Sequence, residues 1–264
     1  MFSENFNRSI SATANLGVGD VIGGAFGAIR KHWIVFGAYA LLLTCLPAAA
    51  GRVVVVTAGV NYTSVANTFA TLGRALLVYS PSYFLFAPLF HSLVAWTIWA
   101  DSVQAPNDFR AAVVAVGRRL GPILLLNIAV LIAEYVGMLL LVIPGIIAVL
   151  ALYTAISACA VEGLSVQEAV RRSLFLTRGQ RWRLFLVLLV ASLIYWGLSI
   201  IINLASMMAG VLINSGSPAA VGVLVLVTGL NALFLTSISG SVYVELLRIK
   251  GGGVGAAATA EIFA

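Results

Sequence analysis

The fold of this chain follows from one apolar stretch, PILLLNIAVLIAEYVGMLLLVIPGIIAVLALYTAISACA, at residues 122–160. A helix needs about 20 apolar residues to cross a hydrocarbon layer of about 30 Å, so this stretch is long enough for two crossings. Pro144 and Gly145 lie near its middle, and proline removes a helical hydrogen-bond donor and restricts the residue before it. We therefore predict one span that ends near Val142, a tight turn at Pro144, and a second span that ends near Cys159.

Four more apolar stretches have a length suited to a membrane span. They lie at residues 33–55, 83–100, 182–212 and 219–247. The chain as a whole has a mean hydropathy of +1.07 and only 9% charged residues, against roughly 25% in an ordinary globular domain. The sequence therefore predicts an all-α polytopic membrane protein with six transmembrane helices in three hairpins.

The basic residues lie almost entirely on alternate connections between these spans. Of the 15 Lys and Arg residues, only Arg52 and Arg74 lie on the other side. The basic clusters are Arg8, Arg30 and Lys31; Arg110, Arg118 and Arg119; Arg171, Arg172, Arg178, Arg181 and Arg183; and Arg248 and Lys250. By the positive-inside rule, this side is cytoplasmic and both termini lie there.

An amphipathic helix is predicted on the cytoplasmic side before each hairpin. The first covers residues 19–31, with Asp20 as its N-cap, and the second covers residues 107–119. Their apolar stripes step by four, three and four residues, as one helical face requires: Ile22, Phe26, Ile29 and Trp33, then Phe109, Val113, Val116 and Leu120. The third begins with Ser165 and Glu168 at capping-box spacing. Such helices with basic ends are typical of the headgroup region, although any helix beside a bilayer would have this pattern.

The chain therefore divides into three modules between two tails. The modules, each an amphipathic helix and a hairpin, cover residues 19–100, 107–160 and 165–247. Residues 1–18 form a cytoplasmic tail, and residues 251–264 form a flexible tail rich in Gly and Ala.

Small residues at helical spacing predict close helix packing. Gly19, Gly23 and Gly27 share one face of the first amphipathic helix, and Thr236 and Gly240 form a pair in the sixth span. These seams would serve either internal packing or a homo-oligomer.

Residues 141–183 contain motifs that resemble a known family. These are LVIPGII at residues 141–147, AVEGLSVQEAVRRS at residues 160–173 and LTRGQRWR at residues 176–183. They are similar to bacterial six-helix proteins named as the glycerophosphoryl diester phosphodiesterase membrane domain, and to related families. The resemblance implies a bacterial inner-membrane protein. In some members this region precedes a soluble phosphodiesterase domain, which we do not expect in this chain.

Glu134 is the one acidic residue placed well inside a predicted span, where a charge costs about 2.5–3.5 kcal/mol. Asn127 lies two turns earlier on the same helix, and Asn203, Asn231 and His91 lie at depths that could reach Glu134. Two interpretations are open. Glu134 is either a coupling or binding acid in a transport pathway, or a neutral group that holds helices together by hydrogen bonds.

The basic clusters also have two interpretations. Arginine offers paired donors to phosphate, so the clusters could bind anionic lipid headgroups, or they could serve only to orient the protein. The headgroup candidates are Arg30, Lys31, Arg118, Arg119, Arg171, Arg172, Arg178, Arg181 and Arg183. These clusters account for the net charge of +6, so we expect no nucleic-acid partner.

No grouping of residues indicates catalysis or a cofactor. The two histidines, His32 and His91, lie at different depths, and no set of metal ligands or phosphate-binding glycine loop is evident. The main hypothesis is a non-enzymatic membrane protein that binds or organises lipid, with anionic membrane lipids as its partners. The alternatives are a small transporter that uses Glu134 and a membrane anchor for a cytoplasmic partner.

Overall fold

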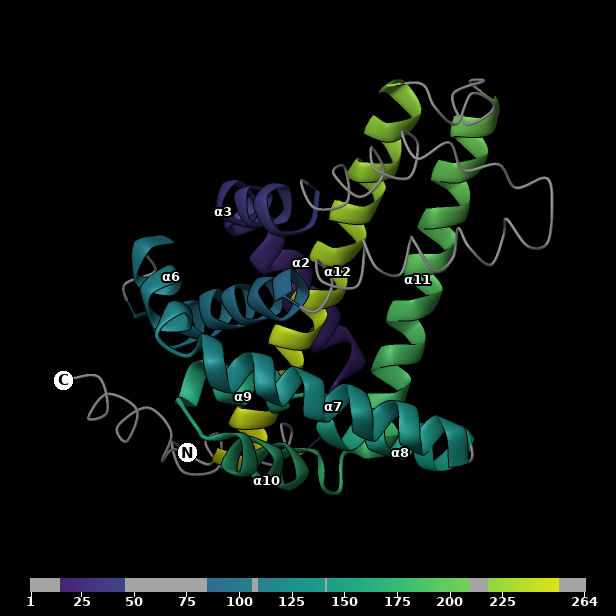
Figure 1. Ribbon diagram of the computed structural model, residues 1–264. Coiled ribbons are helices and arrows are strands. Elements are labelled where there is room, and N and C mark those ends of the chain that lie inside the picture. The colour runs from purple at the N-terminus through teal and green to yellow at the C-terminus, as the bar shows by residue number, and fades with distance from the viewer. Residues whose placement is uncertain (1–14, 46–84, 106–108, 141, 209–217, 252–264) are drawn as a thin grey trace, which may run out of the picture.

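The computed structural model describes residues 15–45, 85–105, 109–140, 142–208 and 218–251, and all regular structure in these ranges is helical (Figure 1). The predicted tails, Arg52 and Arg74 lie wholly or largely outside these ranges. A helix covers residues 85–102. The others are α2 (Val18–Lys31), α3 (Trp33–Ala40), the π-helix η1 (Leu41–Cys45), α6 (Phe109–Gly117), α7 (Leu120–Leu140), α8 (Val142–Leu152), α9 (Ala155–Glu162), α10 (Val166–Thr177), α11 (Arg181–Met208) and α12 (Pro218–Gly251).

Four stretches of helix within these ranges are long and apolar enough to cross a membrane. They are Leu120–Gly137, Ile143–Glu162, Arg181–Ile202 and Gly229–Lys250. The described part of the first predicted span, Trp33–Leu43, is a shorter apolar helix. These four candidate spans support the prediction that the chain is a membrane protein.

The long helices form two pairs that run in different directions. Figure 1 shows α11 and α12 rising together, while the α7–α8 hairpin lies across their lower ends. Only 11% of the Arg181–Ile202 stretch is buried in the protein, compared with 56% of Gly229–Lys250. The C-terminal half of α12 therefore belongs to the core, whereas α11 presents most of its apolar surface outward.

The core forms where residues 85–102, α9 and α12 meet. Every residue from Ser92 to Ala100 is buried, and α9 contributes mainly small buried side chains. Gly240 of α12 is required here, because a Cβ at this position would lie 2.8 Å from the Ile98 side chain and 3.3 Å from the Ala95 Cα. This contact agrees with the close packing predicted for Gly240.

The predicted division of residues 122–160 into two spans is confirmed, since α7 ends at Leu140 and α8 begins at Val142, but the break does not lie at Pro144. Helix α8 already begins at Val142, so Pro144 lies in its first turn, where the missing N–H costs no helical hydrogen bond. Gly145 instead serves helix packing: a Cβ on Gly137 of α7 would lie 3.0 Å from the Gly145 Cα.

The fourth predicted span is interrupted rather than continuous. Helix α8 ends at Leu152 and α9 begins at Ala155, with Thr154 between them as the N-cap position of α9. Such a break leaves carbonyl groups without helical partners. The Ser173 hydroxyl of α10 donates a hydrogen bond to the Ala151 carbonyl at 2.8 Å, which compensates for the break and fastens α10 to it.

Asp20 is not the N-cap of the first amphipathic helix. Helix α2 begins at Val18 and Gly17 occupies the cap position, so Asp20 lies in the first turn. Its negative charge there still favours the helix, because the N-terminal end of a helix carries partial positive charge.

Part of each predicted apolar stripe on α2 and α6 faces outward. Helix α2 buries Val21, Ala25 and Ala28, while Phe26 and Trp33 of the predicted stripe are exposed. Helix α6 likewise buries Ala112 and Val116, and the other three stripe residues, Phe109, Val113 and Leu120, are exposed. Aromatic and aliphatic side chains exposed on one side of a helix are typical of an apolar or interfacial environment.

The predicted capping box at the start of α10 is confirmed. The Glu168 carboxylate accepts hydrogen bonds from the Ser165 hydroxyl at 2.7 Å and from the Ser165 backbone N–H at 3.0 Å. These two bonds, the hydroxyl first, hold the pKa of Glu168 below its usual range.

Substituting Gly137 by Leu is expected to destabilise the protein by about 1–3 kcal/mol or more, because the neighbouring atoms are backbone and cannot rotate away. Gly197→Leu on α11 is the matched control, since a Cβ there meets no atom within 4 Å. Thermal unfolding of the two variants in the same detergent measures the difference. Equal stabilities would contradict the close approach of α7 and α8.

Glu168→Gln is expected to remove a pH-dependent part of the stability. The lowered folded-state pKa means that the stabilisation is complete above the unfolded value of about 4.3 and is lost as the pH falls through the folded value. The variant should therefore unfold more easily than the parent at pH of about 7, and the difference should shrink toward pH of about 3. A difference that does not depend on pH would contradict this assignment.

Candidate functional site

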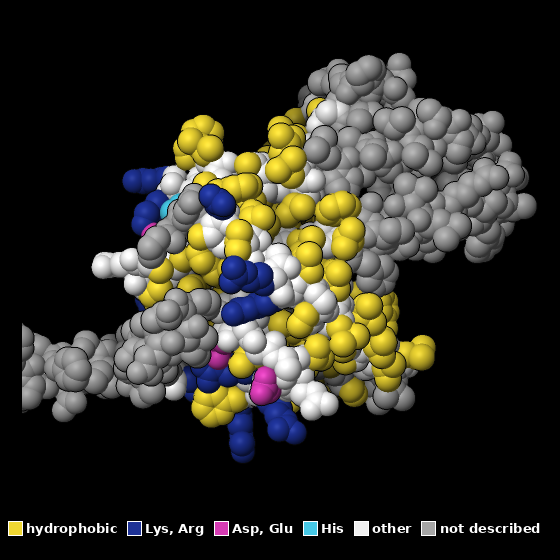
Figure 2. Space-filling model, turned by 60° about the vertical axis from the view of Figure 1, so that its left-hand side comes forward, with side chains coloured by type: hydrophobic (Ala, Val, Ile, Leu, Met, Phe, Trp, Pro, Cys, Tyr) yellow, Lys and Arg dark blue, Asp and Glu magenta, His cyan; other side chains and the backbone are white. Residues whose placement is uncertain are grey.

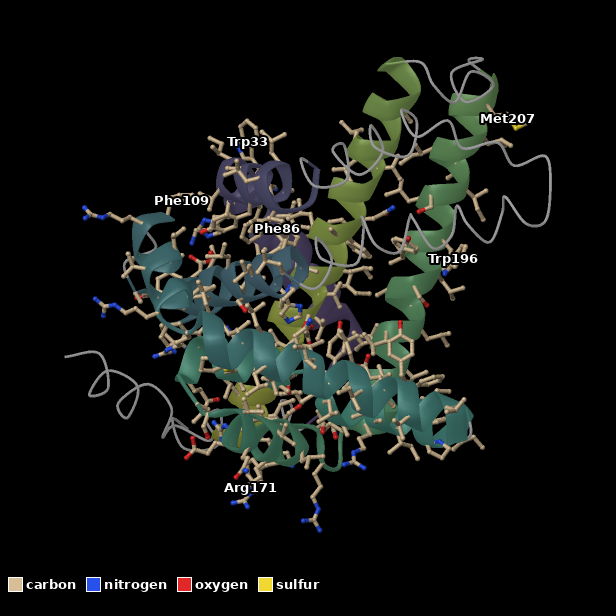
Figure 3. The ribbon with its side chains drawn as sticks, in the orientation of Figure 1. Trp33, Phe86, Phe109, Arg171, Trp196 and Met207 are labelled. Atoms are coloured by element: carbon tan, nitrogen blue, oxygen red, sulfur yellow. The ribbon has the colours of Figure 1, made fainter. Side chains whose placement is uncertain are left out.

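Arginine side chains gather where α10 turns into α11. Arg178 follows the end of α10, Gly179 adopts a left-handed conformation with φ +82°, and Arg181 begins α11. This turn brings the arginines at the two helix ends to one side of the molecule. Figure 3 shows Arg171 of α10 pointing away from the protein at the bottom of the view. We call Arg171, Arg178, Arg181 and Arg183 the α10–α11 arginine surface.

Exposed aromatic rings accompany these arginines. Trp182 is 74% exposed, and its ring stacks on Phe185 with centroids 5.4 Å apart. Phe175 of α10 is also exposed, and the Lys250 Nζ lies 5.7 Å from the centre of its ring. Tryptophan next to basic residues at the end of an apolar helix is typical of a membrane–water interface.

Arg181 has a donor that the protein does not satisfy. Its Nε is buried, yet it has no hydrogen-bond partner among the described residues. A guanidinium carries five N–H donors in a planar fork that matches the oxygens of a phosphate.

Two of the predicted headgroup arginines instead bind within the protein. Arg172 Nε lies 2.9 Å from Glu162 Oε1, and the Tyr243 hydroxyl donates to the same oxygen at 2.8 Å. Tyr243 is fully buried in α12, so this cluster joins α9, α10 and α12.

Arg119 closes the C-terminal end of α9. Its Nη1 donates to the carbonyls of Ala160 at 2.8 Å and Val161 at 3.3 Å. Gly163, with φ +72°, is needed beside it, because a Cβ there would lie 2.4 Å from the guanidinium. Burial lowers the pKa of Arg119, an effect that nearby Cys159 partly offsets.

The remaining headgroup candidates lie at other helix ends. Arg30 and Arg118 are exposed, and Lys31 forms an ion pair with Asp101 at the end of the helix over residues 85–102. On the face in Figure 2, basic side chains gather toward the left and the bottom, with apolar ones between them and to the right. The candidates thus occupy several sites rather than a single cluster.

His91 and Asn231 have partners, although neither of them bonds to Glu134. The His91 Nε2 lies 3.1 Å from the Ser157 hydroxyl and 3.2 Å from the Ser239 hydroxyl, which come from α9 and α12. The Asn231 amide donates to the Ser199 hydroxyl at 3.3 Å and so links α12 to α11.

Glu134 and Asn127 form no side-chain hydrogen bond within the part of the chain that the structure describes. Glu134 is partly buried on α7, and Asn127 is buried two turns earlier. The side chain of Asn203 lies outside the described residues. The polar cluster expected around Glu134 is therefore not assembled by the described groups.

Sequence reasoning missed the partners in both polar clusters. Ser157 and Ser239 carry no distinguishing signal, because serine is common in packed membrane helices. Glu162 was more recognisable, since an acid at the end of an apolar stretch with arginines ten residues later suggests an ion pair. The third member, Tyr243, is far away in sequence and no spacing could have connected it.

Within the described ranges, no group of three or more His, Cys, Asp or Glu residues could hold a metal ion. Comparison of the chain with protein-family models, curated proteins and solved structures finds no match. The function proposed below therefore depends on the chain's own residues.

Tyr243→Phe is expected to destabilise the protein by about 1.5–3 kcal/mol, since it removes a buried hydrogen bond to a carboxylate. Tyr195→Phe on α11 is the control and should change stability by less than about 0.5 kcal/mol. Chemical or thermal unfolding followed by tryptophan fluorescence gives both values. Equal effects would show that the Tyr243–Glu162 bond does not contribute.

Proposed function

We propose that this protein is a non-enzymatic integral membrane protein that binds or organises anionic lipid at the α10–α11 arginine surface. The observation that carries the proposal is that exposed Arg178 and exposed Trp182 flank the turn between α10 and α11. A lipid phosphate would accept hydrogen bonds from the exposed arginines, and its acyl chains would contact the aromatic ring and the apolar outer face of α11.

The charge of this surface supports the same assignment. Arg172 is already paired with Glu162, whereas Arg171 and Arg178 are exposed and form no ion pair or hydrogen bond within the described ranges. Each basic residue near an anionic membrane surface contributes about 1 kcal/mol to binding. Arginine is suited to phosphate because it can donate two parallel hydrogen bonds.

The proposed setting is the inner membrane of a bacterium, with six spans and both termini in the cytoplasm. The one-sided basic clusters support the orientation. The bacterial inner membrane is what the resemblance of residues 141–183 to the glycerophosphoryl diester phosphodiesterase membrane domain implies, and that resemblance stays a prediction because no family model matches the chain. Glu134 forms no hydrogen bond with a described group, which argues against the interpretation that it holds helices together, so a small transporter that uses Glu134 stays the alternative.

The test is lipid retention by the purified protein. Native mass spectrometry of the wild type, released from vesicles of phosphatidylglycerol and phosphatidylcholine, should show bound phosphatidylglycerol. Arg178→Gln/Arg181→Gln should weaken this binding by roughly 30-fold, which corresponds to about 1 kcal/mol for each charge.

Arg110→Gln/Arg248→Gln is the charge-matched control and should retain the lipid, because Arg110 lies on α6 and Arg248 already pairs with Glu245. A wild type that retains no phosphatidylglycerol, or equal losses in both double variants, would refute specific binding at this surface.

A further inference from the structure

A second surface with a different architecture lies along α2. It is an open cavity of about 510 Å³, and the described residues that line it are Phe26, Gly27, Arg30 and Lys31. These positions alternate by three and four residues, so they form one side of the helix.

The floor of this cavity exists because residue 27 has no side chain. A Cβ on Gly27 would meet no atom within 4 Å, and the same is true of Gly23 and Gly19, one and two turns earlier. Gly24, in contrast, faces the protein, where a Cβ would lie 3.6 Å from the Ser241 hydroxyl of α12. The packing of α2 therefore uses the opposite side of the helix.

One wall of the cavity is aromatic and held in place. The Phe26 ring lies 5.7 Å from the Phe234 ring of α12, yet Phe26 is still half exposed. The apolar floor and this wall suit a hydrocarbon chain.

The two basic residues at the other end differ in their contacts. Lys31 is paired with Asp101, whereas Arg30 is exposed and has no ion pair within the described ranges. A second copy of this chain docked through the same face would bring Arg30 near another Arg30, and like charges disfavour that contact. The charge favours an anionic occupant.

We infer that the cavity binds one anionic phospholipid, with its phosphate at Arg30 and an acyl chain along Gly27 and beside Phe26. The neighbouring Trp33, which Figure 3 shows on the outer side of α3, would anchor this end of α2 at the headgroup level. The inference shares the proposed membrane setting, but it does not depend on the α10–α11 arginine surface.

The experiment counts bound phosphatidylglycerol in vesicle-derived samples by native mass spectrometry. Gly27→Leu should fill the cavity without changing charge, and about one bound lipid per chain should be lost. Arg30→Gln should weaken the same binding by roughly 5-fold. Gly197→Leu, at an open glycine on α11, and Arg110→Gln are the matched controls and should keep the full count.

Gly27→Ala keeps the test informative if Gly27→Leu fails to fold. Alanine favours a helix more than glycine does, so this variant should unfold at an equal or higher temperature and still bind less lipid. Full lipid binding by Gly27→Leu and Gly27→Ala would overturn the inference. A shift from dimer to monomer with no change in lipid count would also overturn it and would identify a second copy as the occupant.

The two proposed lipid sites can be tested separately. Arg178→Gln/Arg181→Gln should keep the α2 lipid, and Gly27→Leu should keep the α10–α11 lipid. A variant that keeps the full lipid count while the other variant loses one lipid therefore identifies its own site as the wrong proposal.

Discussion

The rest of the structure depends on the close approach of helices at small residues around residues 85–102. Gly240 brings α12 against Ala95 and Ile98, and α9 contributes mainly small buried side chains. In a lipid bilayer, burial of hydrocarbon contributes little free energy to helix association. Helices therefore associate by close packing and by hydrogen bonds between polar groups. This packing brings Glu162 of α9 and Tyr243 of α12 within hydrogen-bond distance.

This internal packing also determines which cations can serve a ligand. Arg119 closes α9 and Arg172 neutralises Glu162, so both are occupied within the protein. Arg178 and Arg30 are exposed at two different helix ends. The proposed lipid sites are therefore the basic positions that remain after the helices have satisfied their own polar groups.

Several elements were predictable because their signals are local. The capping box of Ser165 and Glu168 has a fixed three-residue spacing, and the start of α10 follows from it. The basic residues before Trp33 and Leu184 likewise mark the starts of apolar helices. Proline was ambiguous: Pro144 can end one helix or begin another, and only the packing of Gly137 on Gly145 shows which occurs.

By itself, the sequence predicted the helical class, six apolar stretches and the ends at which basic residues concentrate, and four of these stretches contain long apolar helices in the structure. Hydropathy and charge are properties of short stretches of the chain. They can therefore be read from the sequence without knowledge of any tertiary contact. The tertiary structure decided that α2 and α6 pack through alanine and valine, that α8 and α9 are separate, and which arginines are paired. Those outcomes depend on which distant residues become neighbours, and no periodicity within one helix contains that information.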